Sequence, residues 1–296
     1  SKITTGAIIA ATAGSGVLTL SGTGGVLADI LTATKDLAIT VNDGNFLKLG
    51  GTSSEVSGEV LTIDLVDSAI FEISAAATNV GDLTADADGD GVFTISAALT
   101  NTALVGSASL DIGTINVNAA TSFGAGSIIH AKTINVAGNA DFTVDVFAQA
   151  IGITGTSTTV TIGDKFGTSG TGATVTMNET AQKIILDGDD TITGNLVAAT
   201  DGFGEVSVTT AKTLAGDIGT STSVRVGLVN IDHDFTSTGN VNADAITIKA
   251  AKDFNANGVT KFIRGTINGE ADANGGQGLI VVNSSGDATK ILTFEG

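Results

Sequence analysis

Residues 114–123 read TINVNAATSF and residues 133–142 read TINVAGNADF, so one phrase returns after 19 residues. Each copy opens with alternating apolar and polar residues, continues through a polar turn, and ends in Phe123 or Phe142. A looser copy occupies residues 245–254 (AITIKAAKDF). One turn of a β-solenoid takes about 20 residues. The repeat therefore predicts a solenoid in which the phenylalanine closes one edge of a thin core.

Short β-branched runs alternate with polar residues in the rest of the chain, and period-two alternation is typical of half-buried strands. These runs are residues 37–41 (LAITV), 60–65 (VLTIDL), 159–162 (TVTI), 173–177 (ATVTM), 205–208 (EVSV) and 245–248 (AITI). Pairs such as Asp43-Gly44 and Asp201-Gly202 stand between them and supply the positive φ of tight turns. We expect an all-β protein, either a β-solenoid or a series of β-sandwiches. Residues 26–37 and 70–80 are weaker candidates for short helices.

Composition excludes several classes of protein. The chain has no cysteine, which removes disulfides, thiol catalysis and cysteine-bound zinc. Its 31 acidic and 13 basic residues give a net charge of −18, which argues against a nucleic-acid partner. No run approaches the ~20 apolar residues of a membrane-spanning helix, so no membrane span is expected. Because the chain begins with Ser1, we expect a processed chain or a fragment.

No proline-rich, glycine-serine or charged linker interrupts the sequence. We therefore expect residues 1–296 to form one continuous β-rich unit, with residues 86–91 as the candidate boundary for a subdivision. The two histidines, His130 and His233, do not lie near a nucleophile-elbow sequence, and tryptophan and tyrosine, which grip sugars in carbohydrate enzymes, are absent. The sequence therefore favours a protein that is not an enzyme.

Two acidic turns are candidate calcium sites. In residues 86–91 (DADGDG), Asp86, Asp88 and Asp90 are spaced as in calcium loops, and the backbone carbonyl of Val92 is a fourth candidate ligand. Calcium takes six to eight oxygen ligands, and this spacing directs three carboxylates into one turn. The second turn, residues 187–194 (DGDDTITG), resembles half of a calcium-binding glycine-aspartate repeat. Its candidate ligands are Asp187, Asp189 and Asp190. A solvated turn without an ion is the alternative at both places.

The chain as a whole resembles prokaryotic cell-surface β-rich structural proteins, namely S-layer subunits and autotransporter passenger regions. The resemblance lies in the missing cysteine, the scarce aromatics, the acidic pI and phrases such as residues 114–123 (TINVNAATSF) and 239–248 (GNVNADAITI). It implies an extracellular location, and the S-layer likeness implies calcium-dependent assembly. Passenger regions of this kind act as adhesins or as a protective coat.

We therefore expect an extracellular structural protein that self-assembles into a filament, sheath or surface layer, with calcium as a stabilising ion. The expected partner is a second copy of the chain. Residues 3–10 and 290–294 are apolar strand candidates near the two ends, and a free strand edge invites pairing with another copy. The alternative is a solenoid adhesin segment that binds host or neighbouring-cell surfaces, including glycans.

Overall fold

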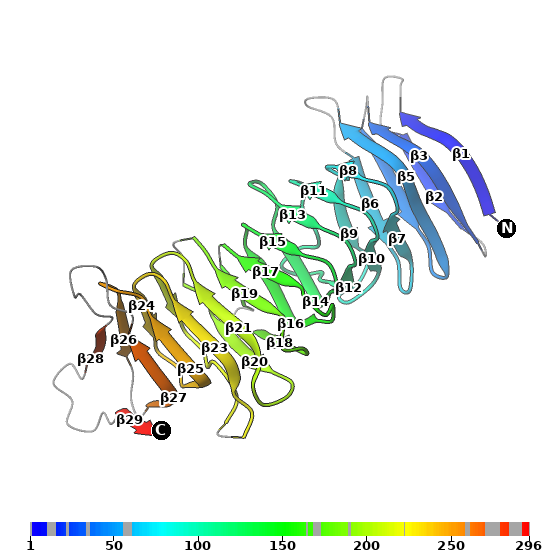
Figure 1. The fold of residues 1–296 in the computed structure, drawn as a ribbon. Coiled ribbons are helices and arrows are strands. Elements are labelled where there is room, and N and C mark those ends of the chain that lie inside the picture. The colour runs from blue at the N-terminus through cyan, green and yellow to red at the C-terminus, as the bar shows by residue number, and fades with distance from the viewer. Residues whose placement is uncertain are drawn as a thin grey trace. The chain divides into compact units, whose positions relative to one another are not determined.

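A computed structural model of the chain describes residues 2–10, 16–21, 24–33, 36–55, 61–163, 165–167, 173–188, 191–221, 223–257, 261–269, 279–283 and 292–295. Every regular element in these ranges is a β-strand. The strands form parallel sheets that wind as a β-solenoid of about ten turns (Figure 1). The chain divides into two compact units, Ser1–Ala140 with Val144–Ala148, and Asp141–Thr143 with Gln149–Gly296.

The first unit contains fourteen complete strands: β1 (Lys2–Ala10), β2 (Gly16–Leu20), β3 (Gly24–Ala33), β4 (Leu37–Val41), β5 (Asn45–Glu55), β6 (Leu61–Leu65), β7 (Ile70–Ile73), β8 (Ala77–Thr78), β9 (Asp82–Ala85), β10 (Val92–Ile95), β11 (Leu99–Asn101), β12 (Ile112–Val117), β13 (Thr121–Phe123) and β14 (Ile129–Val136). They pair in the orders β1-β3-β5-β7-β10-β12-β14, β2-β4-β6-β9 and β8-β11-β13. Each face of the solenoid therefore receives one strand from each successive turn. Two further strands, β15 (Ala140–Phe142) and β16 (Val146–Ile153), contain residues of both units.

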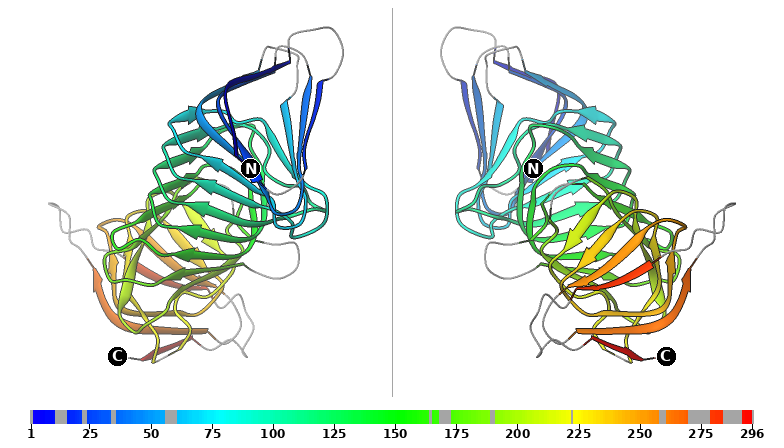
Figure 2. Two further views of the ribbon diagram at one scale, coloured as in Figure 1. Left: turned by 90° about the vertical axis from the view of Figure 1, so that its right-hand side faces the viewer. Right: turned by 90° about the vertical axis from the view of Figure 1, so that its left-hand side faces the viewer.

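The second unit contains β17 (Thr159–Ile162), β18 (Ala173–Met177), β19 (Lys183–Leu186), β20 (Gly194–Ala198), β21 (Phe203–Val208), β22 (Lys212–Leu214), β23 (Val226–Ile231), β24 (Phe235–Ser237), β25 (Val241–Ile248), β26 (Asp253–Asn257), β27 (Lys261–Gly269), β28 (Leu279–Asn283) and β29 (Leu292–Glu295). They pair in the orders β16-β18-β20, β17-β19-β21-β23-β25-β27-β29 and β22-β24-β26-β28. Figure 2 shows the strands of each unit stacked in parallel in two further views.

The strand register of the sheet matches the sequence repeat. Thr114 pairs with Thr133 and Ile115 with Ile134, so β12 and β14 align as the two TINV phrases do. Phe235 and Phe254 pair in the same way between β24 and β26. Parallel, in-register pairing of strands from successive turns confirms the solenoid. It excludes the serial sandwich, whose sheets are antiparallel.

The core follows from the two-residue alternation of side chains. Ile115, Ile134, Phe123 and Phe142 are each at most 1% exposed, and the intervening residues face outward. Phe71 and Phe93 from adjacent turns stack at 5.4 Å between ring centroids. Inward-facing residues of neighbouring turns thus pack on one another as well as across the interior.

Two expectations from the sequence are corrected. Residues 70–80 form β7 and β8 in place of a helix, and residues 26–33 belong to β3. Phe46 is half-buried because it lies on the outward side of β5, between the buried residues Asn45 and Leu47. Pairing with strands above and below overrides the local spacing of apolar residues in these segments.

Candidate functional site

Residues 86–91 form the loop that connects β9 to β10 in the first unit. This loop contacts the preceding and the following turn of the solenoid. The Asp90 carboxylate accepts backbone N–H groups from Asp67, at 2.9 Å, and from Ala87, at 3.2 Å. The Asp88 carboxylate accepts the backbone N–H of Asp111 at 3.1 Å. Asp90 therefore holds the preceding turn of the solenoid, and Asp88 holds the following one.

The other two calcium candidates make backbone contacts. The N–H of Asp86 donates to the Leu65 carbonyl at 3.0 Å, and its side chain is exposed. Val92 begins β10, and its N–H donates to the Ala69 carbonyl at 2.9 Å. Among the residues that the structure describes, no group of three or more histidine or acidic side chains is arranged to hold a metal ion. Calcium at this turn stays a prediction, in competition with the protein partners of Asp88 and Asp90.

Lys132 contacts two carboxylates that belong to two earlier turns. Its Nζ atom is 2.7 Å from Asp88 Oδ2 and 3.1 Å from Asp111 Oδ2. The hydrogen bond to Asp88 raises the pKa of Lys132, and the same bond lowers the pKa of Asp88. Asp88, Asp111 and Lys132 come from three successive turns of the solenoid, and we call this row of side chains the first charge ladder.

His130 adjoins this ladder on β14. Its ring stacks on Phe147 with 4.7 Å between centroids, and its Nδ1 atom is 3.9 Å from Asp111 Oδ1. Burial lowers the pKa of His130, although the charges of Asp111 and Asp145 oppose that shift. The neutral imidazole is therefore the form that this environment favours.

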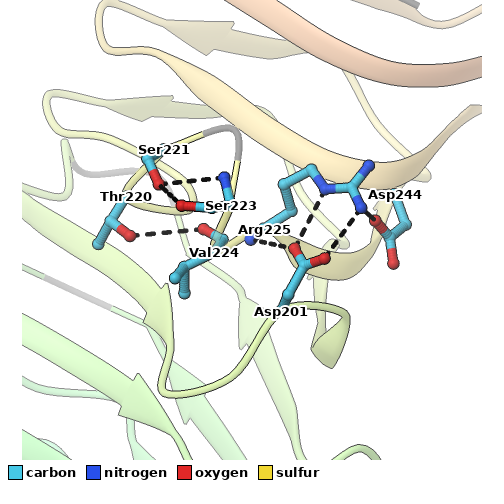
Figure 3. Close-up of polar contacts among 7 residues, drawn as sticks. All are labelled: Asp201, Thr220, Ser221, Ser223, Val224, Arg225 and Asp244. Atoms are coloured by element: carbon cyan, nitrogen blue, oxygen red, sulfur yellow. Dashed lines mark hydrogen bonds and ion pairs between the residues drawn. The ribbon is translucent and has the colours of Figure 1, made fainter.

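A second charge ladder lies in the second unit (Figure 3). The guanidinium of Arg225 forms a two-point contact with Asp201, Nε to Oδ1 at 3.1 Å and Nη2 to Oδ2 at 3.0 Å. The same Nη2 atom is 2.8 Å from Asp244 Oδ1. The backbone N–H of Arg225 also donates to Asp201 Oδ1 at 2.8 Å. The hydrogen bond from the Arg225 side chain lowers the pKa of Asp201.

The second calcium candidate falls partly outside the described residues, because these do not include Asp189 and Asp190. Asp187 follows β19 and accepts the N–H of Gly188 on Oδ1 at 3.0 Å. Its charge, together with the larger effect of burial, raises the pKa of Asp141. One atom of that carboxylate, Asp141 Oδ1, is buried without a hydrogen-bond partner.

No protein-family model matches the chain, and no curated protein or solved structure is similar to it at a significant level. Within the described ranges, no helix is long and apolar enough to cross a membrane. The fold and the local chemistry are thus the basis for a functional proposal.

Sequence reasoning recognised the Asp86–Gly91 turn but missed the partners of its carboxylates. Lys132 stands 44 residues after Asp88, which is the length of two turns, and Arg225 stands 24 residues after Asp201. A search for opposite charges at one or two repeat lengths would have found both ladders. Chemically, each ladder supplies charge-assisted hydrogen bonds that join separate turns of the solenoid.

Proposed function

We propose that the protein is an extracellular structural β-solenoid that self-assembles into a filament, sheath or surface layer. The observation that carries this proposal is the position of β1. Among the strands that the structure describes, β1 occupies the outer place of its sheet and pairs in parallel with β3 from Lys2 to Ala10. Such an edge strand presents a row of backbone N–H and C=O groups to a further strand.

The geometry of the stack supports self-association. Each internal strand pair is parallel and nearly in register, so a second copy that pairs with β1 would repeat a contact that the fold already uses. A contact between two different surfaces of identical chains does not close, and it generates a filament. The partner in this proposal is therefore a second copy, bound by strand addition.

Charge sets a condition on the assembly. The net charge of −18 makes copies repel one another, and divalent cations would reduce that repulsion. Calcium as a stabilising ion, and the cell surface as the location, belong to this proposal and follow from the resemblance to S-layer subunits. Calcium need not occupy the Asp88 turn to act in this way.

Blocking the edge of β1 tests the proposal. Successive residues of a strand direct their N–H groups to opposite edges, so of Thr4→Pro and Thr5→Pro, made singly, one removes an N–H that an added strand would bind and the other removes an N–H that faces β3. The variant that removes the outward N–H should abolish polymers seen by sedimentation velocity. The matched control, Thr4→Val/Thr5→Val, keeps both N–H groups and should polymerise as the unaltered chain does. Circular dichroism checks that the β content survives. Polymers of unchanged size from both single proline variants would refute strand addition at β1.

An adhesin is the second candidate, and one observation favours it. Leu104 and Ile128 are 41% and 38% exposed, and they lie in neighbouring turns that are joined through Val105. Contiguous exposed apolar patches mark interaction sites on soluble proteins, and this pair is where we place the surface that an adhesin would use. If the purified chain stays monomeric but binds cells, and Leu104→Ser/Ile128→Ser abolishes that binding, the adhesin replaces the structural protein.

A further inference from the structure

Four consecutive strands of the first unit recur in the second with the same lengths. The strands β11, β12, β13 and β14 have 3, 6, 3 and 8 residues, and β22, β23, β24 and β25 also have 3, 6, 3 and 8. Their first residues are 99, 112, 121 and 129 in one unit and 212, 226, 235 and 241 in the other. The two series are therefore separated by an almost constant 112 to 114 residues. Strands β12 and β23 also share one pattern of buried and half-buried positions.

The bridges between turns repeat with the same spacing. In the first unit Val105 bridges Leu83 on one side and Ile129 on the other. In the second unit Ile218 bridges the equivalent residues, Leu196 and Val241. A short antiparallel bridge follows each of these positions, between Ser107 and Leu110 in one unit and between Ser221 and Val224 in the other. Figure 3 shows the second of these serine turns beside Arg225.

A close backbone approach is also reproduced. A Cβ atom on Gly113 would lie 2.2 Å from the Gly89 carbonyl oxygen, and a Cβ atom on Gly227 would lie 2.5 Å from the Gly202 carbonyl oxygen. Gly89 and Gly202 both have positive φ, at 97° and 79°. The sequences around them, residues 88–91 (DGDG) and 201–204 (DGFG), share the aspartate that anchors each charge ladder.

The ladders occupy equivalent positions but differ in the order of their charges. Asp88 corresponds to Asp201, and both accept the backbone N–H that begins the next turn, from Asp111 and from Arg225. At the next two positions of the ladder, the positive and the negative side chain have exchanged places. Where the first unit has an aspartate and then Lys132, the second has an arginine and then Asp244.

We infer that residues 83–136 and 196–248 are two copies of one module, and that its ladder needs one cation in contact with two carboxylates in either order. In both copies the cationic side chain touches both carboxylates, and its place in the row is what differs. An ordinary exposed ion pair contributes little to the stability of a protein. The ladder adds a backbone donor from the next turn, so it fixes the register of the turns as well as their charge. This inference is independent of self-assembly.

Exchanging the charges of the first ladder tests this inference. Asp111→Arg alone leaves two cations beside one carboxylate, and Lys132→Asp alone leaves three carboxylates. Each single variant should lower the urea midpoint of unfolding. The double variant Asp111→Arg/Lys132→Asp reproduces the order of the second unit, so it should recover most of the combined loss. The backbone N–H of residue 111 is present in every variant, so its protection from hydrogen exchange reports whether Asp88 still binds it.

A matched control uses an ordinary ion pair of the first unit, Lys48 with Glu72 at 2.6 Å. The exchange Lys48→Glu/Glu72→Lys reports the cost of reversing charges outside a ladder. Slow hydrogen exchange at the N–H of residue 111 should be lost in both single ladder variants and return in the double variant. A double variant that loses as much stability as the two single variants added together would overturn the equivalence of the modules.

Discussion

Replacing Gln182 with methionine should destabilise the second unit far more than its conservative size suggests. Gln182 is fully buried, and its side chain forms hydrogen bonds with four backbone groups. Oε1 accepts the N–H groups of Asn178, at 2.5 Å, and Glu179, at 3.1 Å. Nε2 donates to the carbonyls of Ile153, at 3.0 Å, and Gly155, at 2.6 Å. Methionine fills nearly the same volume and makes none of these bonds.

The size of the expected loss in stability depends on which of the four backbone groups can form another hydrogen bond. The Ile153 carbonyl keeps a bond from the Asn178 side chain at 2.7 Å, and the exposed Glu179 N–H can turn to water. The N–H of Asn178 and the carbonyl of Gly155 are left. An unsatisfied buried group costs about 1–3 kcal/mol, and the low end of this range applies because Asn178 and Gly155 are half-buried. We therefore expect Gln182→Met to lower the free energy of unfolding by about 2 kcal/mol.

Urea unfolding followed by circular dichroism measures this loss, and an unchanged m-value would show that the exposed surface is the same. Gln149→Met is the matched control, because Gln149 is exposed on β16, and its effect should stay within about 0.5 kcal/mol. A loss below about 1 kcal/mol for Gln182→Met would contradict the assigned network.

Three further predictions concern the core, pH and calcium. Phe93→Ala removes a fully buried ring that stacks on the preceding turn, so it should cost about 3–5 kcal/mol by urea unfolding, and no loss would contradict the packing. The pKa of His130 is lowered in the folded chain, so stability should fall as pH drops from about 6.5 through that lowered value. His130→Phe, which keeps an aromatic ring beside Phe147, should remove that slope, measured as the difference between the two pH titrations. If calcium binds at residues 86–91, it should raise the melting temperature of the unaltered chain but not of Asp88→Asn, whereas an equal rise in both would place calcium elsewhere.

The strands and their register were predictable because both depend on local sequence patterns, namely the alternation of apolar and polar residues and the repeated phrases. The alternation in residues 37–41, 159–162 and 173–177 marks the limits of β4, β17 and β18. The 19-residue offset of the TINV phrases gives the pairing of β12 with β14. Residues 70–80 were ambiguous because alanine and valine at mixed spacing suit a helix or a narrow β core equally well.

The charge ladders were not predictable from local patterns because their members lie one or two turns apart in the chain. The 86–91 turn has the spacing of a calcium loop, yet Asp88 and Asp90 bind backbone groups of turns 23 residues away. The duplication was hidden for a similar reason. The two modules differ in charge at equivalent positions such as Asp111 and Arg225, so their sequences do not show the duplication directly. Their strand lengths and close glycine contacts do show it.

Negative-stain electron microscopy of the purified chain, first in millimolar calcium and then in chelator, tests self-assembly most directly. We expect the chain to form ordered filaments, tubes or sheets in calcium without another protein, and we expect them to loosen when calcium is removed. Ordered polymers that ignore the chelator would keep the structural role and discard calcium as its condition. Isolated particles in both conditions would show that the chain does not assemble by itself.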